Sequence, residues 1–303
     1  MSSPAGLALQ PGEHIPVLIA PIVEILQAQN PRLVVDLTFG LGGYAQAVTR
    51  ALPHCRYLGF DRDAEAVAKG QLRFAGQTHI KIQQADFLNW WQFLPADEKA
   101  DAILMDLGIS STQLDDGTRG FSFQVDGPLD MRMNQQGEAT AAQWLQNQST
   151  ESLADALFNF GDVRQARPLS RRIVERLPIE STGALKSAVL SVLPRLDFHK
   201  RQRILSQVFQ AIRIGVNQEW EQLQKGLTLA WENLNIGGQL AVVTFHSGED
   251  KIVKTFGRSV ACEALKLIKP DPTETAQNPR SRSAKLRVLK KSVSMLDYRR
   301  ATA

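Results

Sequence analysis

The sequence predicts an α/β protein in which a doubly wound parallel sheet is split by an inserted helical domain. Three observations support this fold class. Strand-like and helix-like segments alternate over roughly the first 110 residues, which is typical of βαβ units. The next hundred or so residues show only helical periodicity, and an apolar strand pattern returns after Gly238.

The first part of the chain supplies four strands and three helices. Short apolar runs rich in β-branched residues, several of them ending in an acid, predict buried strands. The expected strands are 32–36, 56–61, 80–84 and 101–106, and the expected helices are 17–29 (interrupted by Pro21), 44–52 and 64–74.

The rest of the chain supplies the insertion and the end of the sheet. Helices are expected over 139–148, 151–160, 182–193, 203–214 and 217–234, the last one capped by Gly237 and Gly238. Strands are expected over 239–245 and 285–290, helical segments over 251–256 and 260–267, and a loop over 270–283. We therefore assign 1–114 and 218–303 to a split sheet domain and 115–217 to an inserted helical substrate-recognition domain.

Composition excludes several classes of protein. With 303 residues, 43% of them hydrophobic and 22% charged, the chain is an ordinary globular protein. It has no apolar run of the ~18 residues that a membrane span needs and no basic start of a signal peptide. Two widely spaced cysteines, Cys55 and Cys262, fit a reducing cytoplasm, and no group of residues has metal-ligand spacing.

Charge is distributed unevenly along the chain. Residues 251–303 hold thirteen Lys and Arg against four Asp and Glu, a net charge of +9, whereas residues 1–250 carry −5. A basic end on a mildly acidic body indicates a polyanionic partner such as nucleic acid. The alternative, a solvated tail that maintains solubility, is equally compatible with the charge.

A nucleotide pocket is expected where the first strand meets its helix. The run from Asp36 to Gly43 places three glycines there, and Asp61 ends the second strand, where a carboxylate can accept both ribose hydroxyls. The pattern is Gly-x-Gly-Gly, without the third glycine of a pyrophosphate site. It therefore favours S-adenosylmethionine (SAM) over NAD, with a simple packing turn as the alternative.

Two further strand ends face the same pocket. Asp86 and Phe87 follow the third strand, where a carboxylate and a ring suit adenine, although Asp86 alone would more often cap a helix. Asp106 ends the fourth strand, where ligands meet such sheets, with a turn acid as the alternative.

Several long motifs of the chain are specific enough to indicate a family. They are Asp36-Leu-Thr-Phe-Gly-Leu-Gly-Gly43, Phe60-Asp-Arg-Asp63, Met105-Asp-Leu-Gly-Ile-Ser-Ser111, Gln113-Leu-Asp-Asp-Gly-Thr-Arg-Gly-Phe-Ser-Phe123, Phe209-Gln-Ala-Ile-Arg-Ile214 and Thr244-Phe-His-Ser247. In these runs the chain resembles the bacterial 16S rRNA cytosine-N4 methyltransferases. The chain departs from the family pattern at Tyr44, Gly248 and Lys251, and it lacks a His-Pro before Phe209.

The resemblance implies a Rossmann-like, SAM-dependent enzyme. It implies methylation of the exocyclic N4 of a cytidine in the decoding centre of 16S rRNA, with the small ribosomal subunit as partner. The cofactor contacts that it carries over are Gly42, Gly43, Tyr44, Asp61, Phe87, Asp106 and Gln113.

Asp106 is the expected catalytic residue. The cytosine amine is a poor nucleophile, so the enzyme must hold it in line with the methyl group and accept its hydrogens. A C5-methyltransferase would need a cysteine nucleophile, and neither cysteine lies beside the Asp106 loop. A DNA or small-molecule methyltransferase and a non-catalytic RNA-binding assembly factor remain the alternatives.

Substrate contacts are expected from the linker and from basic clusters, with ion pairs, core packing or solvated faces as the alternatives. The candidates are Arg119, Asp126, Asp130, Arg132, Trp144 and His246, the arginines 164, 167, 171, 172 and 176, and Arg195, Lys200, Arg201 and Arg203.

Overall fold

The computed structural model describes residues 16–136, 139–194, 196–260 and 262–292. The chain divides into two compact units, the first made of residues 1–108 and 221–303 and the second of residues 109–220. The sequence placed these boundaries at 114/115 and 217/218. Each unit is described separately.

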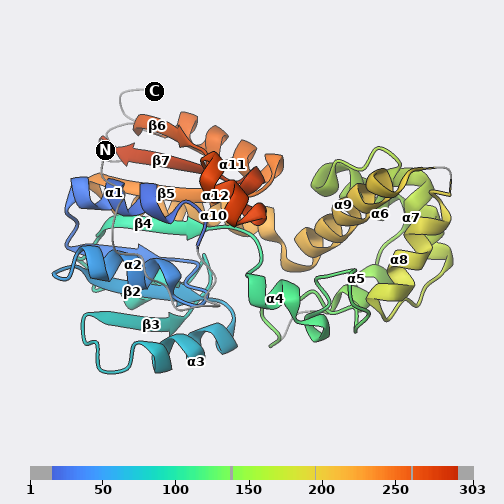
Figure 1. The fold of residues 1–303 in the computed structure, drawn as a ribbon, viewed down its shortest axis with the longest axis horizontal. Helices are drawn as coiled ribbons and strands as arrows, with labels where there is room; N and C mark the ends of the chain where they lie inside the picture. Colours follow the sequence, from blue (N-terminus) through green and yellow to red (C-terminus); the bar gives the residue numbers. More distant parts are fainter. Residues whose placement is uncertain (1–15, 137–138, 195, 261, 293–303) are drawn as a thin grey trace. The chain divides into compact units, whose positions relative to one another are not determined.

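Unit 1 is built on a seven-stranded sheet in the order β3-β2-β1-β4-β5-β7-β6 (Figure 1). The strands are β1 (Leu33–Asp36), β2 (Arg56–Asp61), β3 (Ile80–Gln84), β4 (Ala100–Asp106), β5 (Leu234–Thr244), β6 (Cys262–Ile268) and β7 (Lys285–Lys291). The pairs among β1 to β5 are parallel, whereas β7 pairs antiparallel with both β5 and β6. The Rossmann-like fold class expected from the sequence is confirmed.

Helices cover both faces of this sheet because its strands bury side chains on both sides. The helical segments of unit 1 are α1 (Ile19–Gln29), α2 (Gly43–Ala51), α3 (Ala64–Arg73), η1 (Trp90–Phe93), α10 (Glu219–Glu232), α11 (Ser247–Ser259), α12 (Pro272–Gln277) and η3 (Pro279–Ser283). One core joins α1, α2 and α3 to alternate strand residues such as Val34 and Leu104. The other joins α10, α11 and Trp90 to their neighbours, such as Val35 and Ile103.

Four expectations for unit 1 are wrong. The segment 260–267 is not helical, because β6 pairs with the free edge of β7; a short apolar run does not distinguish helix from strand. The segment 270–283 forms α12 and η3 instead of a loop. Gly237 and Gly238 lie within β5, where the pairing with β4 shifts register, and α10 ends earlier, at Glu232. Pro21 lies in the first turn of α1, where proline does not interrupt a helix.

Unit 2 is helical around a single apolar core. Its segments are α4 (Ser111–Asp115), η2 (Gly117–Arg119), α5 (Ala141–Gln146), α6 (Thr150–Gly161), α7 (Ala166–Glu175), α8 (Thr182–Ser191) and α9 (Phe198–Asn217). The sequence did not predict α7, because its many arginines obscure a narrow buried face of Ala166, Leu169 and Ile173. The other four long helices lie close to their expected positions.

Candidate active site

Three carboxylates lie at one edge of the sheet in unit 1. Asp36 ends β1, Asp61 ends β2 and Asp106 ends β4. These three strands are parallel neighbours, so their carboxyl ends meet at the same edge, where open α/β sheets bind ligands. We call this the carboxyl edge.

The glycine loop after β1 is tied to the end of β2. The amide of Gly40 donates to Asp61 Oδ2 over 2.8 Å. Gly42 has a φ of 77°, and a Cβ there would lie 2.6 Å from the rings of Phe39 and Phe74, so glycine is required at this position. A Cβ at Gly43 would meet the ring of Pro16. Gly42 and Gly43 thus allow close packing of the loop against neighbouring rings.

Asp61 keeps acceptor capacity for a ligand. Its Oδ1 accepts from the amide of Asp63 over 2.9 Å and its Oδ2 from that of Gly40, so each oxygen retains a lone pair. Burial raises the pKa of Asp61 to about 6, and the two backbone amides act in the opposite direction. At neutral pH the group is predominantly a carboxylate, the form that accepts hydrogen bonds from hydroxyls.

Asp36 is fully buried and serves the fold of the site. Its Oδ2 accepts from the Tyr57 hydroxyl over 2.7 Å, and its Oδ1 accepts from the amide and the hydroxyl of Thr38 over 3.0 and 3.3 Å. Burial raises the pKa of Asp36 to about 6 against these hydrogen bonds. The Thr38 hydroxyl also accepts from the amide of Asp106 over 2.6 Å. A chain of hydrogen bonds therefore runs from Tyr57 to the backbone of Asp106.

Asp106 carries a buried carboxylate oxygen, Oδ1, that has no hydrogen-bond partner in the structure. Burial raises the pKa of Asp106 well above its ordinary value; the carboxylates of Asp36 and Glu249 add to this, and the Tyr44 hydroxyl acts in the opposite direction. A buried acceptor without a donor is unfavourable. A ligand that brings an ammonium or amine group to this oxygen would remove that cost.

Two other expected cofactor residues have structural roles in unit 1. Tyr44 begins the buried face of α2, and its hydroxyl donates to the carbonyl of Val17 over 2.5 Å. Phe87 is half-buried, and a Cβ at Gly226 on α10 would lie 2.6 Å from its Cβ. Asp86 accepts from the amides of Leu88 and Asn89 in the turn before η1, whose N-cap is Asn89, so Asp86 orders a turn and is not itself the helix cap that the sequence left open.

Gln113 belongs to unit 2. It completes a capping box at the start of α4: its amide donates to the Ser110 hydroxyl, and its Oε1 accepts from the amide of Ser110. The cofactor contact expected of Gln113 remains a prediction.

Residues after β5 are held by polar contacts within unit 1. Nδ1 of His246 caps α11, and the carboxylate of Glu249 accepts from the amide of Phe245 over 2.8 Å. The carboxylate of Asp250 accepts from Lys285 Nζ over 2.9 Å and from Arg287 Nε over 2.6 Å. These contacts favour the structural interpretation of His246.

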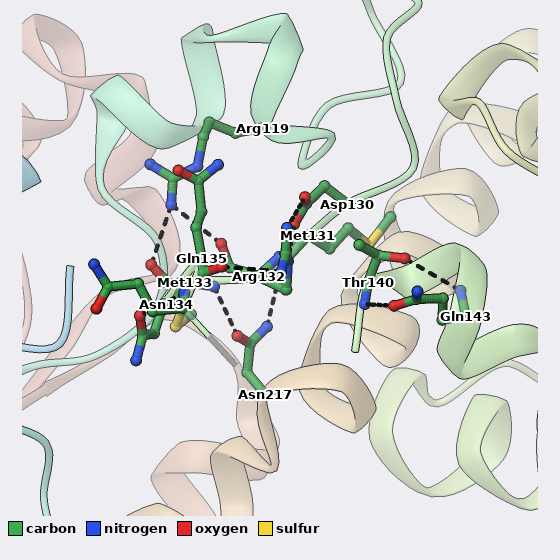
Figure 2. Close-up of polar contacts among 11 residues, drawn as sticks. Arg119, Asp130, Met131, Arg132, Met133, Asn134, Gln135, Thr140, Gln143 and Asn217 are labelled. Atoms are coloured by element: carbon green, nitrogen blue, oxygen red, sulfur yellow. Dashed lines mark hydrogen bonds and ion pairs between the residues drawn. The ribbon is translucent and has the colours of Figure 1, made fainter. Parts of the chain in front are cut away.

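The expected substrate residues of the linker are largely engaged inside unit 2 (Figure 2). Arg119 is 5% exposed and donates to the carbonyls of Arg132 and Met133 over 3.1 Å. Two nitrogens of Arg132 clamp the carboxylate of Asp130, and the amide of Asn217 bonds the backbone of Met131 and Met133. The segment is thus held rigidly from both sides.

Two more candidates in unit 2 are also structural. The carboxylate of Asp126 accepts from the amide of Gly183 over 2.6 Å at the start of α8. Trp144 packs in the core, where a Cβ at Gly215 would meet its ring. The side-chain contacts of Arg195 lie outside the described residues.

Part of the basic C-terminal segment serves the sheet. Lys285 and Arg287 pair with Asp250, Lys290 lies 3.0 Å from Glu263, and Lys291 is buried, with Nζ donating to the carbonyls of Trp231 and Leu234. Arg280 and Arg282 on η3 have exposed side chains, and residues 293–303 lie outside the described part of the chain. The charge asymmetry therefore overstates the surface available to a polyanion.

Sequence reasoning missed the roles of Thr38 and Tyr57. Thr38 lies inside the motif that led to the pocket, but a threonine between an acid and a glycine gives no sign that it holds the end of a strand 68 positions away. Tyr57 lies in the continuous buried run of β2, so the sequence pattern does not distinguish it from an aromatic residue that only fills the core. The sequence motifs of the pocket predicted where the polar residues lie along the chain, but they did not predict which groups are joined by hydrogen bonds.

The described residues contain neither a metal-binding cluster nor a membrane-spanning helix. Among them, no group of three or more His, Cys, Asp or Glu side chains could hold a metal ion. None of the helices in that part of the chain is long and apolar enough to cross a membrane.

A doubly wound sheet with a glycine loop and acid-ended strands defines a Rossmann-like protein whose ligand site lies at the carboxyl edge. The profile of the MraW methylase family matches residues 12–292. The chain belongs to this family, as its resemblance predicted, and it is a methyltransferase that uses SAM as its methyl donor.

Curated relatives agree over most of the chain. A "Ribosomal RNA small subunit methyltransferase H" from Xanthomonas campestris pv. campestris (strain 8004) is 41% identical, covering 93% of this chain and 88% of the relative. A protein of the same name from Methylobacterium sp. (strain 4-46) is 41% identical, covering 90% and 89%. A solved rRNA methylase from Streptococcus thermophilus has a TM-score of 0.45 at 12% identity, covering 93% of this chain and all of that one.

Proposed function

We propose that this enzyme methylates the exocyclic N4 of a cytidine in the decoding centre of 16S rRNA. Two facts support the proposal. The relatives carry the name of a small-subunit rRNA methyltransferase over nearly their whole length. The single observation that carries the chemistry is the unpaired, buried Oδ1 of Asp106 at the carboxyl edge, an acceptor suited to an amine.

Some residues of the carboxyl edge would bind the methyl donor, and Asp106 would bind the amine that receives the methyl group. SAM supplies a methyl group on a sulfonium when bound. Asp61 would accept from the ribose hydroxyls of the donor, beside the glycine loop whose Gly40 amide it already binds. Asp106 would accept a hydrogen of the cytosine amine, so that the nitrogen lone pair is directed at the methyl group. Thr38 would hold Asp106 in place through its amide.

The cysteines support nitrogen as the methylated atom. Methylation at carbon 5 of the ring needs a thiolate nucleophile. Cys55 lies in the apolar core, and burial raises the pKa of its thiol to about 11, so it stays protonated at neutral pH. Cys262 begins β6, which lies at the sheet edge beyond β7, whereas Asp106 ends the central strand β4. Neither thiol is placed for attack on a base at Asp106.

The remaining assignments belong to the same proposal. The helical unit of residues 109–220 would recognise the RNA, and the reaction would take place in the cytoplasm on the small ribosomal subunit or its rRNA. Phe87 would lie against the adenine, and the cofactor contacts that the family resemblance implies for Tyr44 and for Gln113 belong to the proposal as well. The three basic residues of α7, all of them exposed, and Arg280 and Arg282 would contact phosphates.

Nucleoside analysis tests the reaction. Small-subunit RNA from cells lacking the protein is incubated with the purified enzyme and labelled SAM, then digested and separated by mass. Label in N4-methylcytidine supports the proposal, whereas label in C5- or ribose-methylated nucleosides refutes it. No incorporation into RNA with intact SAM binding would favour a non-catalytic binding protein.

Asp106→Asn tests the assigned role of Asp106. The variant keeps the shape of the side chain and halves its acceptor capacity. If Asp106 acts on the reacting amine, the single-turnover rate at saturating SAM should fall by about 10²–10³-fold. A loss confined to SAM affinity would assign Asp106 to the cofactor alone.

A further inference from the structure

We infer that the start of α9 is a stacking platform for an unpaired nucleotide of the RNA substrate, with Phe198 as the ring that stacks. We use "α9 platform" for Phe198, His199, Lys200 and Arg203. The inference rests on the proposed RNA substrate and adds to it a recognition surface in unit 2.

Phe198 is left bare by the fold. Its relative exposure is 67%, although it is the first residue of a 20-residue helix whose other apolar side chains face the core. The nearest ring among the described residues is the exposed His199, with centroids 5.7 Å apart and planes at 77°. A phenyl ring that is this exposed buries little apolar surface, so it contributes little to the stability of the fold. It presents an apolar surface that a partner can cover.

The charges around Phe198 select the partner. Lys200 and Arg203 are exposed on the same turns of α9, and Arg201 lies between them with its Nε donating to the carbonyl of Leu196. The one acid of this stretch, Asp197, caps the helix through the amide of Lys200. Its 3.0 Å contact with Lys200 Nζ joins two largely exposed side chains and neutralises little in water. The platform is therefore an aromatic ring in a cationic setting.

A second exposed phenylalanine of unit 2 provides the comparison. Phe158 on α6 is 59% exposed, but its helix carries Glu151 and Asp155, has no lysine or arginine, and ends at Asp162. The ring of Phe158 is about as exposed as that of Phe198, but the acidic side chains on its helix would repel a polyanion such as RNA. The two rings thus differ in charge environment and not in accessibility, and only Phe198 combines the two features that bind unpaired nucleotides: a stacking ring and adjacent cations.

The experiment measures binding of a single-stranded fragment of small-subunit rRNA by fluorescence anisotropy, after binding by the wild-type protein has been established. Phe198→Ala should weaken binding by about 5- to 100-fold. Phe198→Trp should retain it, and Phe198→Leu should resemble Phe198→Ala if stacking and not apolar burial is responsible. Phe158→Ala is the matched control and should bind like the wild type.

The salt dependence separates the ring from the charges. Phe198→Ala should leave the slope of log affinity against log salt unchanged, because no phosphate contact is lost. Arg203→Ala should reduce the slope by about 0.7. SAM affinity, measured in parallel, should be equal in all variants and confirms that unit 1 is folded; far-UV circular dichroism equal to that of the wild type confirms that the helices of unit 2 are folded.

Three outcomes would overturn the inference. They are wild-type RNA affinity in Phe198→Ala, full binding by Phe198→Leu, and a loss of affinity in Phe158→Ala as large as that in Phe198→Ala. If naked RNA binds normally but assembled subunits are methylated slowly by Phe198→Ala, the ring contacts a protein. If the wild-type protein binds no RNA, both the proposed RNA substrate and the α9 platform are refuted. If the wild type binds RNA and Phe198→Ala binds it equally well, only the α9 platform is refuted.

Discussion

Replacing Thr38 by valine removes one hydroxyl that joins two strand ends. That hydroxyl accepts from the amide of Asp106 over 2.6 Å and donates to Asp36 Oδ1 over 3.3 Å. Valine has nearly the same shape, so no cavity forms. Asp36 keeps the Tyr57 hydroxyl and the Thr38 amide as donors, whereas the amide of Asp106 loses its acceptor.

The cost follows from that one orphaned donor. A buried amide left without a partner costs about 1–3 kcal/mol. For a unit of 150–250 residues each kcal/mol lowers the melting temperature by roughly 2–4 °C. In the proposed mechanism Asp106 would then no longer be fixed beside the reacting amine, so we expect the single-turnover rate at saturating SAM to fall by about 10- to 100-fold.

Thr38→Ser is the matched control, since it retains the hydroxyl and loses only a methyl group. It should stay within about three-fold of the wild-type rate, a margin of well under 1 kcal/mol. Calorimetric melting and single-turnover kinetics of both variants measure the two effects. Equal rates for Thr38→Val and the wild type would refute the positioning role, and an equal loss in Thr38→Ser would assign the effect to the methyl group.

Three other outcomes are expected. Asp61→Ala should weaken SAM binding by about 1.5–3 kcal/mol in calorimetric titration, because a charged acceptor is lost; unchanged affinity would remove Asp61 from the pocket. Burial lowers the pKa of Lys291 to about 8, below its ordinary 10.5, so the unfolded chain binds more protons between these values. The stability of the wild type relative to Lys291→Met should therefore rise by up to about 3 kcal/mol from pH 7 to 10, and a flat difference would contradict the buried lysine. Charge reversal at Arg280 and Arg282 should flatten the salt dependence of RNA binding by roughly 0.7 per lost contact without changing SAM affinity. An unchanged salt slope would leave these two arginines as a solvated face.

The periodic parts of the fold could be predicted because apolar patterning determines them. The strands β1 to β4 were expected within about a residue of their observed bounds, since β1, β2 and β4 are short, mostly buried runs that end in an acid and β3 is a short alternating run followed by a turn. The hairpin of β6 and β7 could not be predicted fully, because the pairing of β6 depends on the free edge of a strand about twenty positions later. Local sequence does not report that partner.

Parts of the candidate site could also be predicted and parts could not. The positions of Asp61 and Asp106 at the carboxyl edge were predictable, because each residue ends a predicted strand. The engagement of Arg119, Asp130 and Arg132 with one another's backbone and side chains was not, because a charged residue in a turn-rich segment suits a ligand and an ion pair equally. Only coordinates distinguish these two uses.

The position of the insertion has a consequence for how the chain is made. β4 ends at Asp106 and its neighbour β5 begins at Leu234, so the whole helical unit is synthesised between two strands that pair directly. During translation the first four strands emerge with one side of β4 unpaired, and they must wait for residues 109–220 to leave the ribosome before β5 can close the sheet. Such a half-sheet exposes an open strand edge to other chains. A helical insert that folds quickly through local contacts shortens this interval, and so the order of synthesis favours an inserted unit made of helices.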